Sequence, residues 1–486
     1  MVASLWFQDA KRTPGAPLDR DMTVDVAVLG AGIVGLTTAL LLERQGARVA
    51  VLEARRVGSG ASGYNTAKLT SLHGLTYGRL ANSLGPDAAR TYGAANEAGI
   101  ARVFELVEEL GIDCDLGRKP NYTYTESSSD VEAVRDEARV ARHLGLPASY
   151  VEELDLPFPV AGAVRFDEQA EFHPVRYLEG IAAALEGPLY EGTVATHVQG
   201  GRVRTVTGAN LTAEHVVVAT HLPFLDRGLY FARCHPERSY VVAARTSNAP
   251  AGMYLSTEQP AHSIRAHGEW LLVGGESHKT GQADAAERYA RLEAWARERF
   301  RLEPELRWAT QDQMPVDGVP YVGRHDPLSS RVWVATGFRK WGLAMGTAAA
   351  ELLAAGIGGR EHPWEQLFDP QRLRPRAAAG SFLKENANVA LRFLGDRVTK
   401  RGGVDEIAPG EGRIVGAGLA QRAAYRDDDG TLHELSARCT HLGCIVSWNS
   451  GERTWDCPCH GSRFAATGEV IEGPAVRPLR SQRPPG

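Results

Sequence analysis

The chain has 486 residues, of which 43% are hydrophobic and 23% are charged, proportions that are ordinary for a globular protein. At roughly 150 residues per domain, this length predicts two to four domains. The formal net charge of -5 argues against a polycationic surface for nucleic acid or an anionic membrane, so we expect neither as a partner.

The N-terminal stretch MVASLWFQDAKRTPG lacks the charged start, apolar core and small-residue cleavage site of a signal peptide. No apolar run approaches the length of about 18 residues that a transmembrane helix needs. We therefore expect a cytoplasmic protein without a transmembrane segment. In a reducing compartment, clustered cysteines favour a metal site, and the isolated Cys114 and Cys234 are expected to be ordinary thiols.

A strand–turn–helix–strand pattern opens the first predicted domain. VDVAVL predicts a buried parallel strand and IVGLTTALLLERQG a helix. Between them, Gly30, Gly32 and Gly35 have the GxGxxG spacing that lets a pyrophosphate approach the backbone at a helix N-terminus. RVAVLE then predicts a second strand ending at Glu53, whose carboxylate suits the ribose hydroxyls of FAD or NAD and disfavours the 2′-phosphate of NADP.

The next segment, RRVGSGASGYNTAKLTSLHG, crowds small and hydroxylated residues between Gly58 and Thr66. Such a loop can run backbone amides along a pyrophosphate and toward a flavin ring. Here the sequence resembles the FAD-dependent D-amino-acid oxidase/glycine oxidase/sarcosine oxidase superfamily. Over about the first 360 residues, that family's segments are matched in order by QAEFHPVRYLEGIAAAL, GTVATHV, AEHVVVATH, DGVPYVG and VWVATGFRKWGLAMGTAAAELLAAG.

The resemblance implies an α/β FAD-binding domain of Rossmann type with an inserted α+β substrate domain. Besides the glycines and Glu53, it implies cofactor contacts from Ser62, Asn65, Thr66, Val194, Gly337, Phe338, Trp341 and Gly342. Some relatives tether FAD through a histidine where this chain has Asn65, and others through a cysteine where it has QDQMPVDG. We therefore expect non-covalent FAD.

The chemistry implied by the resemblance is oxidation of a C–N bond of an amine or amino acid to an imine. A carboxylate substrate would need an arginine clamp, for which Arg265 is the candidate and Arg245 and Tyr240 are rivals. Lys340, by its position near the flavin, would stabilise anionic reduced flavin or activate oxygen. Together with His278, which follows a strand expected near the pocket, Lys340 and Arg265 are the candidate catalytic residues.

After this region, PQRLRPR and the residues up to VTKRGG predict a basic, proline-containing linker and an amphipathic helix that packs on its own chain. Further on, two short boxes, CTHLGC from Cys439 and CPCH from Cys457, hold four of the 6 cysteines. A structural zinc site, which is the alternative, usually has paired C-x-x-C spacing. One cysteine and one histidine in each box, plus a spare cysteine, match a Rieske [2Fe–2S] centre.

The two boxes resemble the disulfide-containing form of the Rieske family. The resemblance implies Cys439 and Cys457 on one iron, His441 and His460 on the other, and a disulfide between Cys444 and Cys459. Ser462 matches a serine that donates to a bridging sulfide. Phe464 stands where high-potential members have a tyrosine, so we expect a potential below the top of the Rieske range of about -150 to +300 mV.

The predicted units follow in chain order. Residues 1–365 form the FAD-dependent oxidoreductase, with FAD-binding segments at about 22–80, 185–225 and 310–360 and a substrate domain mainly at 81–184 and 226–309. Residues 366–400 form the linker and helix. Residues 401–486, with short strands and a hairpin turn at DDDG, form a small all-β Rieske domain.

Joining both halves predicts a redox relay, and the whole architecture resembles bacterial D-amino-acid-oxidase-like flavoproteins with a C-terminal Rieske domain. FAD would oxidise a small amine or amino acid, and the cluster would pass single electrons to an external acceptor, a protein or oxygen. The alternative is an NAD(P)H-driven reductase serving a partner protein, which the lack of a second GxGxxG disfavours.

A Rieske oxygenase and a non-catalytic redox sensor are two further alternatives. A Rieske oxygenase needs a 2-His-1-carboxylate iron site, which Glu258, His262 and His267 imitate, but Pro260 and the strand-like context interrupt a helical ligand pair.

Overall fold

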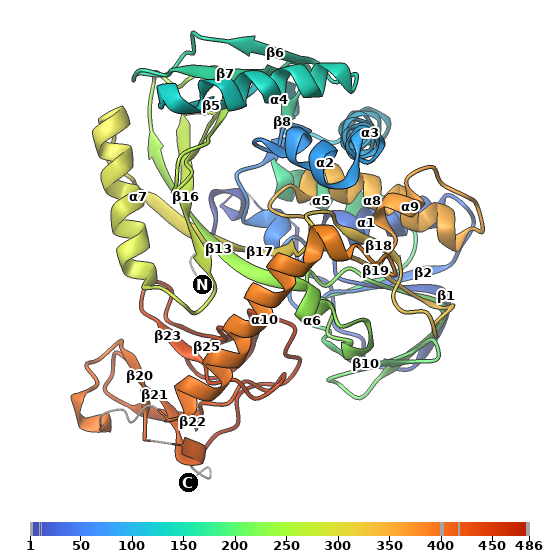
Figure 1. Cartoon of the computed structure of the whole chain (residues 1–486). Coiled ribbons are helices and arrows are strands. Elements are labelled where there is room, and N and C mark those ends of the chain that lie inside the picture. The colour runs from blue at the N-terminus through green and yellow to red at the C-terminus, as the bar shows by residue number, and fades with distance from the viewer. Residues whose placement is uncertain (1–2, 9, 11, 399–402, 417, 483–486) are drawn as a thin grey trace.

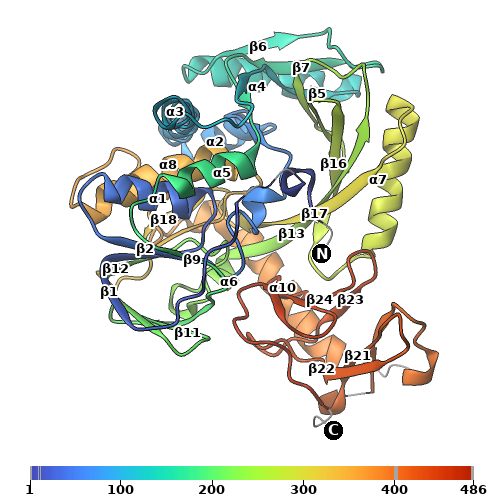
Figure 2. The ribbon, with the colours of Figure 1, turned by 180° about the vertical axis from the view of Figure 1, so that it is seen from behind.

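The computed structural model describes residues 3–8, 10, 12–398, 403–416 and 418–482. The junction expected at 400–401, between the linker helix and the Rieske domain, lies outside the described residues. Figure 1 shows a helix-covered sheet, a second upright sheet and a C-terminal β domain, with the long helix α10 (Pro375–Val398) running between the bodies. Figure 2 shows the same three bodies from behind.

The first sheet is the nucleotide-binding layer. Five parallel strands lie in the order β9 (Leu189–Tyr190), β2 (Val49–Leu52), β1 (Met22–Leu29), β12 (Asn210–Val218) and β19 (Val332–Thr336). Antiparallel strands β10 (Ala195–Gln199), β11 (Arg202–Thr205) and β18 (Tyr321–Arg324) extend it. Every residue of β2 and β19 is buried, including Thr336 at the end of β19, as in strands covered on both faces.

Helices pack over one face of this sheet. They are α1 (Ile33–Glu43), α3 (Pro86–Leu110), α5 (Pro174–Ala183) and α8 (Gly342–Ile357). At the crossing of α3 and α8, a Cβ on Gly99 would lie 2.1 Å from the Ala344 carbonyl oxygen, so only glycine allows this close approach. The expected unit of strand, glycine turn, helix and strand is therefore present as β1–α1–β2.

The second sheet has eight strands and belongs to the inserted domain. Its order is β17 (Leu306–Pro315), β13 (Cys234–Arg245), β16 (Trp270–Lys279), β15 (Ser263–His267), β14 (Met253–Ser256), β5 (Asn121–Thr125), β7 (Gly162–Phe166) and β6 (Ala148–Val151). Helix α7 (Ala285–Phe300) packs on β13 and β16, and α4 (Val131–His143) packs on β6 and β7. The strand β17 thus lies in this sheet, and the FAD-binding segment expected from about 310 begins within it.

Short elements connect these layers. They include a small three-stranded sheet, in the order β3 (Lys68–Leu69), β8 (Ala170–Glu171) and β4 (Gly117–Arg118). They also include three short helices, α2 (Thr76–Leu84), α6 (Tyr230–Arg233) and α9 (Glu365–Phe368). Single 3₁₀ turns occur at Leu5–Phe7, Ala61–Gly63, Ser128–Asp130, Asp226–Gly228, Val404–Glu406 and Gly418–Ala420.

The C-terminal domain is built from two small antiparallel sheets, as expected. One holds β20 (Gly412–Val415), β21 (Arg422–Arg426) and β22 (Leu432–Ser436), and the other β23 (Ser447–Asn449), β24 (Thr454–Asp456), β25 (Arg463–Ala465) and β26 (Val470–Glu472). The hairpin turn at DDDG is present, because Asp427 donates its N–H to the Thr431 carbonyl oxygen at 3.0 Å.

Helix α10 packs on its own chain, as the sequence indicated. The Asn386 side-chain amide donates to the Ala232 carbonyl oxygen at 3.0 Å, and Glu385 forms an ion pair with Lys279. Among the described residues, no helix has both the length and the apolarity required to cross a membrane.

Candidate functional site

One elongated cavity runs from the glycine turn of the nucleotide sheet to the end of the second sheet. Of the residues implied by sequence, it is lined by Gly30, Gly32, Glu53, Ser62, Asn65, Thr66, Val194, Phe338, Lys340, Trp341 and Gly342. Gly35 and Gly337 lie behind this lining. A Cβ on Gly35 would lie 1.8 Å from the Gly30 carbonyl oxygen, so Gly35 allows the helix to pack against the turn.

The glycine turn has the geometry of a phosphate site. Gly30 has φ +107°, and a Cβ there would lie 2.5 Å from the Ala219 carbonyl oxygen. At the first turn of α1, the Ile33 N–H donates to Ser62 Oγ at 3.1 Å. Because the free N–H groups of a helix N-terminus attract anions, this end of the cavity fits a pyrophosphate.

Glu53 lies at the end of β2, facing the same turn. Its carboxylate accepts hydrogen bonds from the Ala31 N–H at 2.8 Å and the Arg55 N–H at 2.9 Å. Burial raises the pKa of this carboxyl, and the two backbone donors oppose that shift. These bonds hold the carboxylate at the place where a ribose hydroxyl would meet it.

Asn65 organises the loop between β2 and β3. Its side-chain amide donates to the Ala61 and Ser62 carbonyl oxygens, at 3.0 and 2.9 Å, and its side-chain oxygen accepts from the Ala67 N–H at 2.7 Å. Ala67 itself has φ 57°, in the left-handed region. Asn65 therefore fixes a strained loop that lines the cavity.

The loop before α8 closes the far end of the cavity. Arg339 and Lys340 have φ values of 52° and 73°, which non-glycine residues rarely adopt. Trp341 stacks on the ring of His73, with ring centroids 4.5 Å apart. The strained turn places the start of α8, at Gly342, in the cavity wall, where a helix N-terminus favours negative charge.

Lys340 brings a cation to this end of the cavity. Its Nζ donates to Ser277 Oγ at 2.7 Å and lies 3.1 Å from the Glu237 carboxylate. Although burial opposes the shift, hydrogen bonds from His235 and Lys340 lower the pKa of Glu237 to about 2. Lys340 therefore lines the cavity as a charge that is held by a neighbouring carboxylate.

The structure corrects the assignment of Arg265 as a substrate clamp. Its side chain is fully buried and donates to the carbonyl oxygens of Thr66, at 3.1 Å, and Ala67, at 2.6 Å. It also lies 3.2 Å from the Glu171 carboxylate and stacks over Trp6. Since these partners occupy the guanidinium, Arg265 supports the loop under the cavity and has no free face for a substrate.

His278 likewise lies outside the cavity lining. Its Nδ1 donates to the Lys279 carbonyl oxygen at 2.7 Å, so its Nε2 accepts from the Tyr240 hydroxyl at 2.9 Å. Burial lowers the pKa of His278, which agrees with this neutral form. The rival Arg245 forms exposed ion pairs with Glu269 and Glu305. His278, Tyr240 and Arg245 are all absent from the cavity lining.

Sequence reasoning overlooked Lys68, which does line the cavity. Its Nζ donates to the Tyr254 carbonyl oxygen and, at 2.7 Å, to Ser263 Oγ. Burial, with a contribution from the charge of Arg265, lowers the pKa of Lys68 well below the usual lysine value. The signal in the sequence was a lone lysine in NTAKLT, two residues after Thr66, which was assigned to the cofactor.

The two C-terminal boxes come together at one place. Cys439 and Cys457 are buried and carry free thiols, while Cys444 and Cys459 form the expected disulfide. The rings of His441 and His460 lie edge to face with centroids 5.1 Å apart.

The protonation of His441 fits a metal ligand. Its Nε2 donates to the Asp226 carboxylate at 3.1 Å, which leaves Nδ1 as the unprotonated nitrogen. This Nδ1 is buried and has no hydrogen-bond partner among the described residues. An orphaned lone pair beside a second imidazole and two thiols matches the donor set of a Rieske cluster. Donation of the other ring N–H to a carboxylate is one of the usual ways in which a metal-binding imidazole is oriented.

Ser462 and Phe464, which the sequence singled out, lie in the core of the same domain. Ser462 is fully buried, and its Oγ accepts from the Ala475 N–H at 3.0 Å. Phe464 is fully buried in the same core cluster as the four box cysteines. The core around the cysteines therefore includes the Ser462 hydroxyl, while Phe464 offers no hydrogen-bond donor to a sulfur.

The residues that imitate an oxygenase iron site do not converge. Glu258 accepts from the Glu126 N–H at 2.7 Å, His262 stacks on Trp295 with centroids 4.1 Å apart, and His267 packs against Trp6. Within the described ranges, the one group with single-ion spacing is Cys444, Cys457 and Cys459, inside the C-terminal boxes. The geometry gives the oxygenase interpretation no support.

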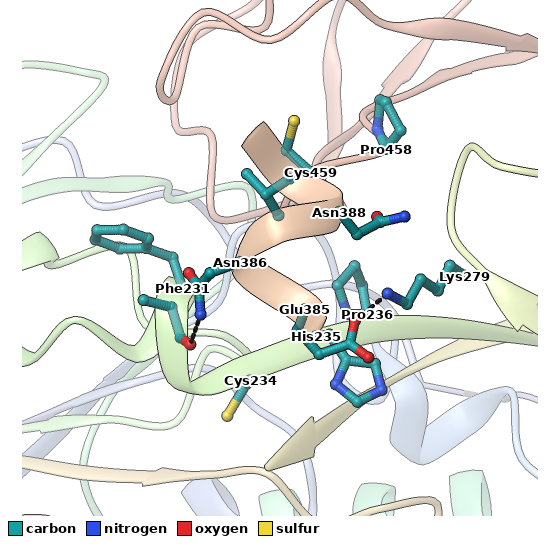
Figure 3. A pocket seen from close by; sticks show the side chains of 12 residues that line it. Phe231, Cys234, His235, Pro236, Lys279, Glu385, Asn386, Asn388, Pro458 and Cys459 are labelled. Atoms are coloured by element: carbon teal, nitrogen blue, oxygen red, sulfur yellow. Dashed lines mark hydrogen bonds and ion pairs between the residues drawn. The ribbon is translucent and has the colours of Figure 1, made fainter. Parts of the chain in front are cut away.

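The C-terminal domain also forms part of the flavin cavity, which the sequence did not indicate. Its residues Val470, Ile471, Glu472, Gly473, Ala475 and Val476 line the cavity together with His221 and Asp312. The imidazoles of His441 and His460 face the other body, because both pack on Phe231 of α6, with centroids 5.7 and 5.3 Å away. Figure 3 shows Phe231 and Cys459 at a small pocket where α10 passes close to both bodies.

The chain thus combines a nucleotide-binding cavity with a cluster of two cysteines and two histidines from the C-terminal boxes. This combination is typical of a flavin-dependent oxidoreductase with an iron–sulfur domain. Residues 25–355 match the FAD dependent oxidoreductase family known as DAO, and residues 398–483 match the Rieske [2Fe-2S] domain. The chain therefore belongs to the DAO family of FAD-dependent oxidoreductases and carries a C-terminal Rieske domain, with FAD and a [2Fe–2S] cluster as its cofactors.

Individual relatives agree with this assignment. The putative Rieske 2Fe-2S iron-sulfur protein YhfW of Bacillus subtilis (strain 168) is 36% identical over 491 residues, which cover 98% of this chain and 96% of that protein. Glycine oxidase from Geobacillus kaustophilus shares the fold with a TM-score of 0.62 at 21% identity, over 72% of this chain and 99% of that one. L-proline dehydrogenase from P. horikoshii does so with a TM-score of 0.61 at 18% identity, over 73% and 98%.

Proposed function

We propose that the chain oxidises a C–N bond of a small amine or amino acid and passes the electrons through its Rieske cluster to an external acceptor. One observation carries the relay: the wall of the flavin cavity is built partly by the Rieske domain, at Val470–Val476. The names of the structural neighbours, glycine oxidase and L-proline dehydrogenase, support an amino acid or amine as the substrate class. The domain bounds, the cofactor contacts, the four cluster ligands, the role of Lys340 and a cytoplasmic location belong to the same proposal.

When bound, FAD accepts a hydride equivalent from the substrate, and the cluster carries single electrons onward. The chain's own residues prepare this chemistry. The N-terminus of α1 binds the pyrophosphate, and Glu53 orients the ribose. The amides at the start of α8 and the cation of Lys340 stabilise negative charge at the far end of the cavity. No covalent tether is proposed, because Asn65 occupies the linking position.

The pocket also offers a group that holds or accepts a proton. An ammonium substrate must lose a proton before its C–N bond can be oxidised. Lys68 lines the cavity as a buried amine whose pKa is lowered, so it is neutral more readily than an ordinary lysine. We assign it the role of proton acceptor. Arg265 and His278 act as supports of the pocket.

An anaerobic reduction experiment tests the proposal. The purified protein is mixed with amines, L-amino acids, D-amino acids, NADH or NADPH, while flavin absorbance and the EPR signal of the cluster are followed. Flavin bleaching by an amine or amino acid, followed by a Rieske signal, is the expected result. Reduction of both centres by a nicotinamide alone would replace the proposal by the reductase alternative.

A further inference from the structure

The wall that the Rieske domain contributes is physically connected to the cluster site. Ala475 lines the cavity, and its backbone N–H donates to Ser462 Oγ at 3.0 Å. The Ser462 carbonyl oxygen accepts from the N–H of the ligand Cys457 at 2.8 Å, and Ser462 follows the ligand His460 by two residues. A single hydrogen bond therefore separates the cavity wall from the loop that carries the cluster ligands.

An ion pair fastens this wall to the nucleotide domain. The carboxylate of Glu472 lies 2.9 Å from Nδ1 of His221, and both residues line the cavity. Burial alone would lower the pKa of His221, but the hydrogen bond and charge of Glu472 outweigh it and raise that pKa. Thr336 donates its hydroxyl to the His221 carbonyl oxygen, which fixes the other partner of the pair.

Buried charges continue the attachment along the interface. Arg463 lies 4.0 Å from Glu472 and 3.1 Å from Glu452, and Glu452 lies 2.5 Å from Arg238 of the substrate sheet. Nearby, the Gln311 side-chain amide donates to the Gly461 carbonyl oxygen at 2.9 Å. Holding the Rieske domain in one position costs conformational entropy, and these buried contacts offset that cost. The domain is therefore docked against the rest of the chain.

The imidazole side of the cluster offers a second contact, which reaches the cavity only through the nucleotide-domain segment before Asp226, where Phe224 lines the cavity. His441 and His460 pack on Phe231, and Asp226 holds His441. As far as the described residues go, the cavity lining does not include Phe231, which lines the small pocket of Figure 3 instead. The wall segment is the connection in which residues of the Rieske domain themselves line the cavity.

We propose that Val470–Val476 is the bridge through which electrons pass inside one chain from the flavin to the cluster, and that Glu472 and His221 are the positioning residues that hold it. Each transfer removes one electron from the reduced flavin and reduces one iron of the cluster from ferric to ferrous, with no bond formed or broken. A one-electron acceptor must empty the cluster before the second transfer. After two transfers, the flavin is oxidised and has released its proton to solvent.

This inference rests on the proposed function only in requiring both cofactors, so its test uses no amine. Illumination with EDTA as electron donor reduces the flavin of the anaerobic holoprotein, and rapid freezing with EPR measures how fast the cluster is then reduced. Glu472→Gln, His221→Gln and the double variant are compared with the wild type. The matched control is Asp427→Asn, which removes the acid of another histidine–carboxylate pair of the same domain, His433 with Asp427 at 3.0 Å.

We expect Glu472→Gln to slow cluster reduction by about tenfold or more, since misplacing reacting groups by about 1 Å can cost about a hundredfold. Rates are compared at equal FAD content, and the EPR line shape of the chemically reduced cluster should stay unchanged. The double variant should be no slower than the slower single variant, because both remove one interaction. Asp427→Asn should match the wild type. Wild-type rates in both single variants would overturn the proposal.

A second measurement needs only the wild type, in case Glu472→Gln fails to retain FAD. If the bridge lies inside one chain, the rate constant for cluster reduction is the same when the protein is diluted. A rate that falls in proportion to protein concentration would show transfer between molecules and would overturn the bridge. If no amine ever reduces the flavin, the proposed substrate class fails while either result here still stands.

Discussion

Arg238 of the substrate sheet and Glu452 of the Rieske domain form an ion pair of 2.5 Å in which the two side chains are 1% and 6% exposed. They are joined by Arg463, which lies 3.1 Å from Glu452 and 3.0 Å from Asp456. Burial opposes the charge of Arg463, but the neighbouring carboxylates outweigh it and raise its pKa. The two domains are thus connected by charges that have been removed from water.

Removing one member of this pair should loosen the Rieske domain. Arg238→Met leaves the Glu452 carboxylate buried with one cation fewer, and we expect a loss of about 3 kcal/mol in unfolding free energy. Arg245→Met, on the same strand, breaks only exposed pairs and should change stability by less than about 1 kcal/mol. Urea unfolding measures both. Equal effects of the two substitutions would contradict a docked interface.

Acid should destabilise the protein through buried neutral histidines. His73 donates from Nε2 to the Thr70 carbonyl oxygen and accepts at Nδ1 from the Tyr92 hydroxyl, and burial lowers its pKa to about 3. The unfolded chain, with a histidine pKa near 6.5, binds the proton first, so stability is lost as pH falls from 6.5 toward 3. Between about pH 7 and about pH 5, this one group should account for about 2 kcal/mol.

His73→Gln removes that titration and should flatten the acid side of the stability profile, although it lowers stability at neutral pH. Urea midpoints measured at several pH values give the comparison. Replacement of the exposed His143, whose side chain lies at the end of α4, should leave the profile unchanged. A variant profile as steep as that of the wild type would show that other groups carry the acid sensitivity.

The potential of the cluster should respond to a hydroxyl at position 464. Phe464→Tyr places a donor in the core that surrounds the box cysteines, where a hydrogen bond to a ligand sulfur stabilises the reduced, more negative cluster. We expect the midpoint to rise by tens of millivolts, from a wild-type value below about +300 mV. Ser462→Ala should lower it. Protein-film voltammetry measures both, and a fall in Phe464→Tyr would be evidence against this tuning.

Lys68 should matter for substrate oxidation and little for cofactor binding. If its neutral amine accepts the substrate proton, Lys68→Met should slow anaerobic flavin reduction by about a hundredfold or more. The acidic limb of the pH–rate profile should also disappear, because the wild-type limb reports protonation of this amine. The FAD content should be retained. The control is Lys384→Met on the exposed part of α10, and a normal rate in Lys68→Met would remove Lys68 from the mechanism.

The local motifs were predictable because each is determined by residues close together in the sequence. Gly30, Gly32 and Gly35 fit a turn whose geometry excludes a Cβ, so their spacing specifies the phosphate site. The two boxes likewise supply all four cluster ligands from two short loops, and donor chemistry determines which metal centre they suit. In both cases the sequence pattern was sufficient to predict the cofactor.

The role of Arg265 could not be predicted in this way. An arginine on a strand near the flavin is equally suited to a substrate carboxylate and to a loop that needs its carbonyl oxygens bound. The choice depends on Thr66 and Ala67, which lie 199 and 198 residues away in the chain. The role of His278 was ambiguous for the same reason. It depends on the partners of the two ring nitrogens, which are the Tyr240 hydroxyl and a backbone carbonyl oxygen in the folded chain.

The sequence by itself determined the two cofactors and the class of oxidoreductase, because ligand spacing and glycine turns are short-range features. Only the tertiary structure decided how the halves are joined. Glu472 and His221 are 251 residues apart, and nothing near either one indicates the other. Their contact arises because the docked domain buries opposite charges together, and burial makes an unpaired charge far more costly than a paired one.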